Sequence, residues 1–148
     1  MSLEQSIAKD LISAMKAKDQ AALRSLRAVK SEILLFQTSG TGATLDEVQE
    51  IKILQKMVKQ RKESLSVFEE QGREDLAAKE RDEIEVISRY LPKQMSEDEL
   101  RTFITNLISE LGAEGMKDMG RVMGQANQRL GGKADGKTIA GIVKSLLG

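Results

Sequence analysis

A run of basic side chains offers the clearest chemistry in the sequence. Between positions 52 and 62 the chain carries Lys52, Lys56, Lys59, Arg61 and Lys62, with no acidic residue among them. Lys52, Lys56 and Lys59 follow the i, i+4, i+7 spacing that places side chains on one side of a helix. Such a row can lie against nucleic-acid phosphates, or it can be a solvated surface that pairs with nearby acids. We take these three lysines as nucleic-acid-binding candidates, without base stacking, because no aromatic residue is interleaved with them.

A second cluster combines glycines with cations near the C-terminal end. Gly120 and Gly124 fall within an expected helix, where glycine costs about 1 kcal/mol relative to alanine, so each needs a reason. Close packing of another helix is the simpler reason, and close approach of a ligand is the other. Arg121, Lys133 and Lys137 flank the glycines, which favours an anionic ligand. The segment is not a phosphate-binding P-loop, because it lacks the Gly-x-x-x-x-Gly-Lys-Ser/Thr spacing and no strand precedes it.

The acidic residues give weaker evidence of a functional site. Glu80, Asp82, Glu83 and Glu85 are dense enough for paired carboxylates or a metal site. Glu80 and Glu83 share a helix face, but Asp82 and Glu85 point elsewhere, and we interpret the four as a solvated helix face. The chain has no histidine and no cysteine. This excludes Ser-His and Cys-His nucleophiles, thiolate or imidazole zinc sites, and iron–sulfur clusters. We therefore expect no metal and no cofactor.

The composition favours a helical protein with a core of its own. The chain has 148 residues, of which 40% are hydrophobic and 3% aromatic, with a single proline. Few aromatic and turn-forming residues are typical of helices rather than of β-sandwiches. No apolar run reaches the roughly 20 residues of a membrane span, and no secretory signal is evident, so no membrane partner is expected. Together with the lack of cysteine, this predicts a cytoplasmic location.

Capping signals and apolar periodicity predict seven helices. Three pairs match the capping box that begins a helix, namely Ser2 with Gln5, Thr44 with Glu47 and Ser96 with Glu99. Asp19 is a further expected N-cap, and either Asp135 or Thr138 caps the last helix. Glycine-containing segments at 39–42 and 131–132 separate helices, and a single helix is expected over 116–130.

Pro92 must end the fourth helix and marks a boundary. We predict an all-α fold with an N-terminal antiparallel four-helix region at 1–93 and a small three-helix domain at 94–148.

Several separated segments resemble the YqeY family. They are LRSLR at 23–27, KQRKES at 59–64, YLPKQMSEDEL at 90–100, MGRVMG at 119–124 and GKADG at 132–136. The resemblance covers essentially the whole chain. The C-terminal half is also similar to the tail domain of the B subunit of the glutamine-dependent aspartyl/glutamyl-tRNA amidotransferase.

The resemblance implies a two-domain helical protein related to a domain that holds tRNA. In that amidotransferase the amidation and phosphorylation chemistry belongs to a separate catalytic body, and the glutaminase to another subunit. We therefore expect a non-catalytic tRNA-binding or tRNA-amidation-associated accessory module, to which a carbon–nitrogen ligase label can attach by name alone. The expected partners are tRNA and an amidotransferase or aminoacyl-tRNA synthetase. The alternative is a helical protein–protein interaction module without direct RNA contact.

The same resemblance singles out residues of the C-terminal motifs. Those expected to meet the nucleic acid are Gly120, Arg121, Gly124, Lys133 and Lys137. Those expected to play a structural part are Met119, Met123, Asp135 and Gly136. Met119 and Met123 would pack, and Asp135 would cap a helix.

Overall fold

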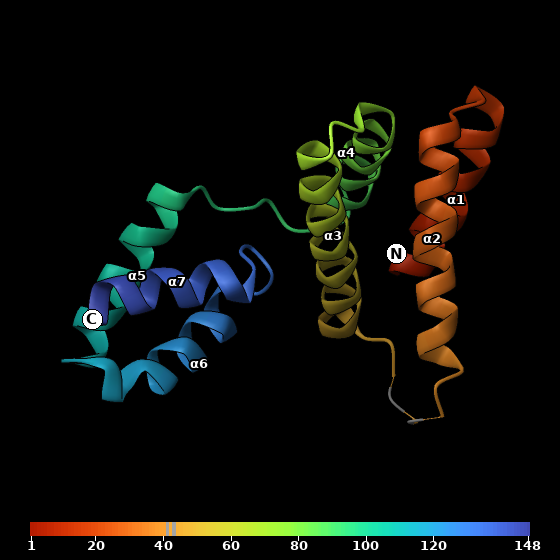
Figure 1. Ribbon diagram of the computed structural model, residues 1–148. Helices are drawn as coiled ribbons and strands as arrows, with labels where there is room; N and C mark the ends of the chain where they lie inside the picture. The colour runs from red at the N-terminus through yellow and green to blue at the C-terminus, as the bar shows by residue number, and fades with distance from the viewer. Residues whose placement is uncertain (41, 43) are drawn as a thin grey trace. The chain divides into compact units, whose positions relative to one another are not determined.

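The computed structural model describes residues 1–40, 42 and 44–148, and over these residues the chain is helical with no strand (Figure 1). This confirms the predicted all-α fold. Its helices are α1 (Leu3–Ala17), α2 (Gln20–Gln37), α3 (Glu47–Glu70), α4 (Glu74–Ser88), α5 (Glu97–Leu111), the 3₁₀ helix η1 (Met116–Asp118), α6 (Met119–Leu130) and α7 (Gly136–Leu147). The chain divides into two compact units, which we call unit 1 (Met1–Leu91) and unit 2 (Pro92–Gly148).

The helix starts follow the capping signals with one exception. Both partners of the predicted boxes at Ser2 and Ser96 make their reciprocal hydrogen bonds. The box at Thr44 and Glu47 is wrong, because Asp46 caps α3 instead, accepting the backbone N–H of Gln49 at 2.9 Å. Aspartate is among the strongest N-cap residues, and Asp46 places the cap two residues after Thr44.

The remaining boundaries differ little from the predicted ones. Asp19 caps α2, and Asp135 caps α7 by accepting the N–H of Thr138 at 2.6 Å. The predicted break at 39–42 follows the end of α2, and position 41 within it lies outside the described residues. The single helix expected over 116–130 is divided into η1 and α6. The division occurs where the carboxylate of Asp118 accepts the N–H of Glu114, at 3.0 Å, which holds a tight turn.

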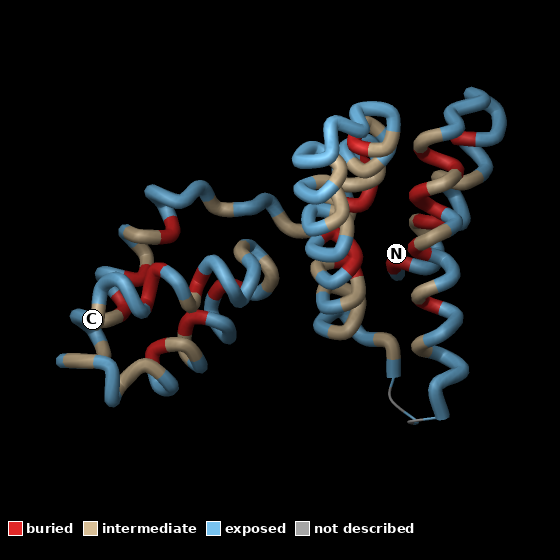
Figure 2. The backbone as a smooth tube through the Cα atoms, viewed as in Figure 1, coloured by how far each residue is buried: buried red, intermediate tan, exposed pale blue. Residues whose placement is uncertain are grey.

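Unit 1 is built from two helical hairpins. Helix α1 packs on α2, and α4 packs on both α3 and α2. Figure 2 shows that the buried residues gather where these helices face one another, while the outer faces are exposed. The core residues are Leu3, Ile7, Ala14, Ala22, Leu23, Leu26, Val29, Ile33, Leu54, Met57, Val58, Val86 and Ile87. The hydroxyl of Tyr90 donates a hydrogen bond to Asp10 of α1, which fastens the segment after α4 to the first helix.

Unit 2 has its own core, formed by α5, α6 and α7. Its buried members are Leu100, Ile104, Leu107, Val122, Ala126, Leu130, Ile139, Ile142 and Val143. The segment that enters the unit is held to the turn between α6 and α7. The N–H of Met95 donates to the carbonyl of Lys133, and the side-chain amide of Gln94 donates to that of Gly132, each at 2.9 Å. The turn between α6 and α7, which carries Lys133, is therefore held in place by two hydrogen bonds from the segment before α5.

Candidate nucleic-acid interface

The predicted lysine row lies on the outer face of α3. Lys52, Lys56 and Lys59 are all exposed, whereas Leu54 and Met57 on the same helix are buried in the core of unit 1. At about 100° per residue the three lysines fall within about 60° of arc, on the side opposite the buried residues. The structure therefore brings these three candidates together on one surface.

One further cation belongs to this surface. Lys62 is exposed and lies one turn beyond Lys59. We call Lys52, Lys56, Lys59 and Lys62 the α3 lysine face. Lys62 belongs to the basic run seen in the sequence, although the binding candidates there were only Lys52, Lys56 and Lys59.

Lysine and arginine differ in whether they form ion pairs in this structure. Over the described parts of the chain, each ion pair within 4.0 Å joins an arginine to an aspartate or glutamate. No lysine takes part in one, and every lysine of the chain is exposed. The planar guanidinium suits fixed pairs, whereas the strongly hydrated ammonium stays mobile on its stem. No carboxylate at ion-pair distance therefore offsets the charge of the α3 lysine face.

Arg121, the predicted phosphate contact of unit 2, is less free. Its side chain is half exposed, but Nη2 lies 3.5 Å from Oδ1 of Asp118, one turn earlier. The same carboxylate accepts the N–H of Glu114, and that hydrogen bond, with the charges of Arg121 and Lys117, lowers the pKa of Asp118. Asp118 therefore stays ionised and offsets part of the charge of Arg121.

Among the residues that the structure describes, none packs on the two glycines beside Arg121. A Cβ atom built on Gly120 or Gly124 would meet nothing within 4 Å outside its own helix, and both residues are exposed. The interpretation that they allow another helix to pack closely is therefore wrong. The buried face of α6 uses Val122, Ala126 and Leu130, and the glycines lie away from it.

We expect Gly120→Ala and Gly124→Ala each to raise the free energy of unfolding of unit 2 by about 1 kcal/mol. Alanine restricts the unfolded chain and favours the helix, and no atom stands in the way of the added methyl group. Urea unfolding of the full chain, followed through the transition of unit 2, measures this. A loss of stability would restore the close-packing interpretation.

Helix α7 carries two exposed lysines on one face. Lys137 and Lys144 are exposed and share the i, i+7 spacing of one helix face, with exposed Gly141 between them. Lys133 lies in the turn before α7, exposed, with its backbone N–H and carbonyl both hydrogen-bonded. Lys144 was missed in the sequence, although it repeats Lys137 after seven residues.

The structural motif residues have clear places. Met119 and Met123 are partly buried against the core of unit 2, and Asp135 caps α7. Gly136 is the exposed first residue of α7, with open space where a Cβ would lie. The candidates of unit 2 thus occupy α6, α7 and the turn between them, and Lys52, Lys56 and Lys59 belong to unit 1.

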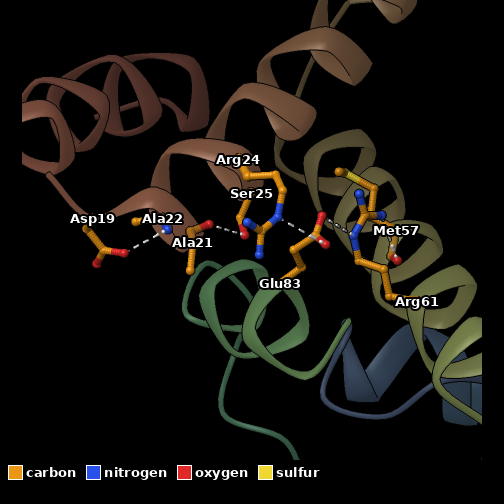
Figure 3. Close-up of polar contacts among 8 residues, drawn as sticks. All are labelled: Asp19, Ala21, Ala22, Arg24, Ser25, Met57, Arg61 and Glu83. Carbon is orange, nitrogen blue, oxygen red and sulfur yellow. Dashed lines mark hydrogen bonds and ion pairs between the residues drawn. The ribbon is translucent and has the colours of Figure 1, made fainter. Parts of the chain in front are cut away.

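A cluster of charged groups inside unit 1 was not foreseen (Figure 3). Arg24 of α2 and Arg61 of α3 both point at Glu83 of α4, with their Nε atoms 3.6 and 3.5 Å from its two carboxylate oxygens. The side chain of Glu83 is only 13% exposed, so its interpretation as part of a solvated face is wrong. Arg61 also donates to the carbonyl of Met57. The available signal was Arg61 itself, a cation on the apolar seam of its helix.

Two of the family-like segments meet in this cluster. Arg24 belongs to the LRSLR segment and Arg61 to the KQRKES segment, and one carboxylate joins them. Beside Arg24, the fully buried Ser25 donates its hydroxyl to the carbonyl of Ala21 at 2.8 Å (Figure 3). Neither arginine Nε finds a hydrogen-bond acceptor among the described residues, so each meets Glu83 as an ion pair rather than through a hydrogen bond.

We expect Glu80→Gln to stabilise unit 1 at neutral pH. Burial and the adjacent Glu83 carboxylate raise the pKa of Glu80, against the smaller pull of Arg61 and Arg24. A carboxyl whose pKa is raised on folding favours the folded state while protonated, and this contribution is lost as the pH rises through the folded pKa. Urea unfolding from pH 4 to pH 8 should show the variant gaining on the parent protein as the pH rises. A constant difference between the two would contradict this.

Comparison with known proteins places this sequence in a family. The sequence pattern of the Yqey-like protein family matches residues 4–147. The chain belongs to the YqeY family. The YqeY assignment confirms the resemblance seen in the separated segments, from LRSLR to GKADG.

The relatives of this YqeY protein include fungal proteins named altered inheritance of mitochondria protein 41, mitochondrial. The one from Lachancea thermotolerans is 36% identical over 105 residues, which are 70% of this chain and 56% of the relative. The one from Clavispora lusitaniae is 33% identical over 131 residues, covering 86% of this chain and 76% of the relative. The one from Pyrenophora tritici-repentis is 28% identical over 142 residues, covering 94% and 77%. The first match thus spans little more than half of its relative.

These names contradict the predicted cytoplasmic location, because the relatives are named as mitochondrial proteins. The prediction depended on the lack of cysteine and of a secretory signal, and neither property separates the cytoplasm from the interior of a mitochondrion. No helix in the described part of the chain is long and apolar enough to cross a membrane. Within the same residues, no group of three or more acidic side chains is placed to hold a metal ion.

Proposed function

We propose that this YqeY protein is a non-catalytic accessory module that binds tRNA, in association with tRNA amidation. One observation carries the proposal: the lysines are exposed and outside every ion pair of the described residues, while arginines supply the internal pairs. Lysine charges left free in this way attract a polyanion and release its counterions on contact. The link to amidation depends on the similarity of the C-terminal half to the amidotransferase tail domain.

The two units would contribute separately. In unit 1 the α3 lysine face would lie along phosphates. In unit 2, Lys133, Lys137 and Lys144 would contact phosphates, and the glycine surface of α6 at Gly120 and Gly124 would let the backbone of the ligand come close. Arg121 would be a weaker contact, because Asp118 competes for its charge.

A second candidate is a protein-interaction module. Leu34 and Leu35 are 59% and 62% exposed near the end of α2, and Val48 is 59% exposed near the start of α3. The N–H of Leu3 donates to Glu50 of α3, and Gln37 of α2 donates to Glu4, so these helix ends meet at the start of α1. Exposed apolar side chains of this kind fit a protein partner better than they fit phosphates.

Filter binding of bulk tRNA to the full chain at about 50 and 200 mM salt tests the proposal. Binding at low salt that weakens steeply at high salt is expected, because phosphate contacts release counterions. The absence of binding at low salt, with the protein folded, would overturn it. An affinity pull-down treated with ribonuclease separates the second candidate, since a protein partner that survives removal of RNA would favour protein docking.

A further inference from the structure

The α3 lysine face says more about its ligand than its charge alone. The four lysines lie on one uninterrupted helix, between positions 52 and 62, and so span about 15 Å at 1.5 Å per residue. Their spacing along the axis is about 4.5 to 6 Å. The row is therefore fixed in length and direction, and only the flexible stems of the side chains adjust. A rigid row of cations best complements a polyanion whose phosphates are also held in place.

A double helix meets this requirement and a single strand does not. A nucleic-acid duplex carries about one phosphate charge per 1.7 Å of axis, in positions fixed by its stacked base pairs. A flexible single strand must instead be ordered along the protein, which costs conformational entropy. Proteins that bind single strands recover this cost by stacking bases on aromatic side chains, at about 1 to 3 kcal/mol for each base.

The chain offers no surface for such stacking. Its aromatic residues are Phe36, Phe68, Tyr90 and Phe103, with no tryptophan, and all four are at least partly buried. Guanidinium planes can also stack on bases, but the arginines of the described residues are held in ion pairs, with the exception of Arg27. The protein therefore has no exposed aromatic ring on which stacked bases could recover the ordering cost, and Arg27 is the one arginine outside the ion pairs of the described residues.

The residues of this surface also argue against recognition of base sequence. On the exposed side of α3, Glu63 follows Lys62 and closes the row, and it would repel phosphates beyond that point. Lysine recognises phosphate as a point charge and carries little sequence information. The major groove of an A-form helix is too deep and narrow for side chains to read. A contact along this row is therefore a contact with the backbone.

We propose that the α3 lysine face binds double-helical nucleic acid through its phosphate backbone, independent of base sequence. This inference depends on the proposed function and specifies its ligand as the helical arms of a folded RNA rather than its loops. The shared chemistry is a rigid phosphate backbone, which RNA and DNA duplexes both present.

Competition experiments with the full chain distinguish these ligands. The protein is bound to labelled bulk tRNA at about 50 mM salt and challenged with a 16-base-pair RNA duplex, a DNA duplex of equal length, and an unstructured uridine-rich strand with the same number of phosphates. We expect both duplexes to compete at least tenfold better than the single strand, and a second duplex of unrelated sequence to compete equally. Competition by the RNA duplex alone also supports the proposal and identifies A-form geometry as what is bound.

Other outcomes overturn the inference without touching the proposed function. If tRNA binds but the single strand competes as well as the duplexes, or if duplex sequence changes the competition tenfold, the ligand is not a sequence-independent double helix. If no RNA binds at all, the proposed function itself fails. A Lys56→Gln/Lys59→Gln double variant should lose affinity for the RNA duplex several-fold. A Lys9→Gln/Lys16→Gln double variant of equal charge change, on the exposed side of α1, should retain it.

Discussion

Replacing Lys52, Lys56 and Lys59 together by glutamine should weaken tRNA binding at low salt by about 30-fold. Each lysine that neutralises a phosphate contributes about one counterion to the salt dependence, so the slope of log K against log salt should become shallower by about three units. The three side chains are exposed and outside the ion pairs of the described residues, so the free energy of unfolding should change by less than about 0.5 kcal/mol. Equilibrium binding over a series of salt concentrations measures both quantities.

A triple variant with the same change in net charge provides the control. Lys9, Lys16 and Lys79 are exposed in unit 1 but lie on α1 and α4. Their replacement by glutamine should lower affinity only by the small, general effect of net charge. Equal losses in the two triple variants would show that overall charge, rather than the α3 lysine face, binds the RNA.

Glu83→Gln should be the most damaging single change of a charged residue in unit 1. It removes the carboxylate shared by Arg24 and Arg61 and leaves two guanidiniums of like charge at the junction of three helices. Breaking a fully buried pair costs about 3 to 5 kcal/mol. Because the side chain of Arg24 is 40% exposed and so screened by water, we expect about 2 to 3 kcal/mol here.

The neighbouring acid on the same helix offers a matched comparison. Glu85 pairs with Arg89 at 3.0 Å, but these side chains are 70% and 61% exposed. Glu85→Gln should therefore cost less than about 0.5 kcal/mol. Urea unfolding of the full chain, with the midpoint and slope of the unit 1 transition compared, measures both variants. Equal costs for Glu83→Gln and Glu85→Gln would mean that the cluster does not join the helices.

Most of the fold could be predicted because its signals are local. Apolar residues three and four positions apart report the buried face of each helix, and Ser2, Asp19 and Ser96 each cap the helix that follows them. The error at Thr44 is also local: two acceptable caps stand two residues apart, and the stronger one at Asp46 begins the helix. The ordinary ranking of N-cap residues places aspartate above threonine and favours Asp46 over Thr44.

The contacts that were missed join residues distant in the sequence. Arg24 and Glu83 meet only because α2 and α4 pack together, and no spacing rule within one helix connects them. The glycines of α6 were misread for a related reason. A glycine four residues from another glycine is equally consistent with a close neighbour and with open space, and only the fold shows that Gly120 and Gly124 have none.

The exposure of the lysines could be predicted from the sequence, but whether acids neutralise them could not. The i, i+4, i+7 spacing placed Lys52, Lys56 and Lys59 on one face, and the structure confirms that all three are exposed there. Whether carboxylates neutralise such a row depends on which helices pack nearby. Pairing with nearby acids was the alternative that the sequence left open for it, yet Glu74 and Glu83 of α4 pair with arginines instead.

Chemical modification of the lysine amines in the presence and absence of bulk tRNA tests the central claim most directly, because it reports every lysine of the intact chain in one experiment. At low salt, bound tRNA should slow the modification of Lys52, Lys56 and Lys59, and of Lys137 and Lys144, several-fold. Exposed lysines elsewhere, such as those of α1, should react at unchanged rates. Unchanged rates at both surfaces while tRNA is bound would contradict the account.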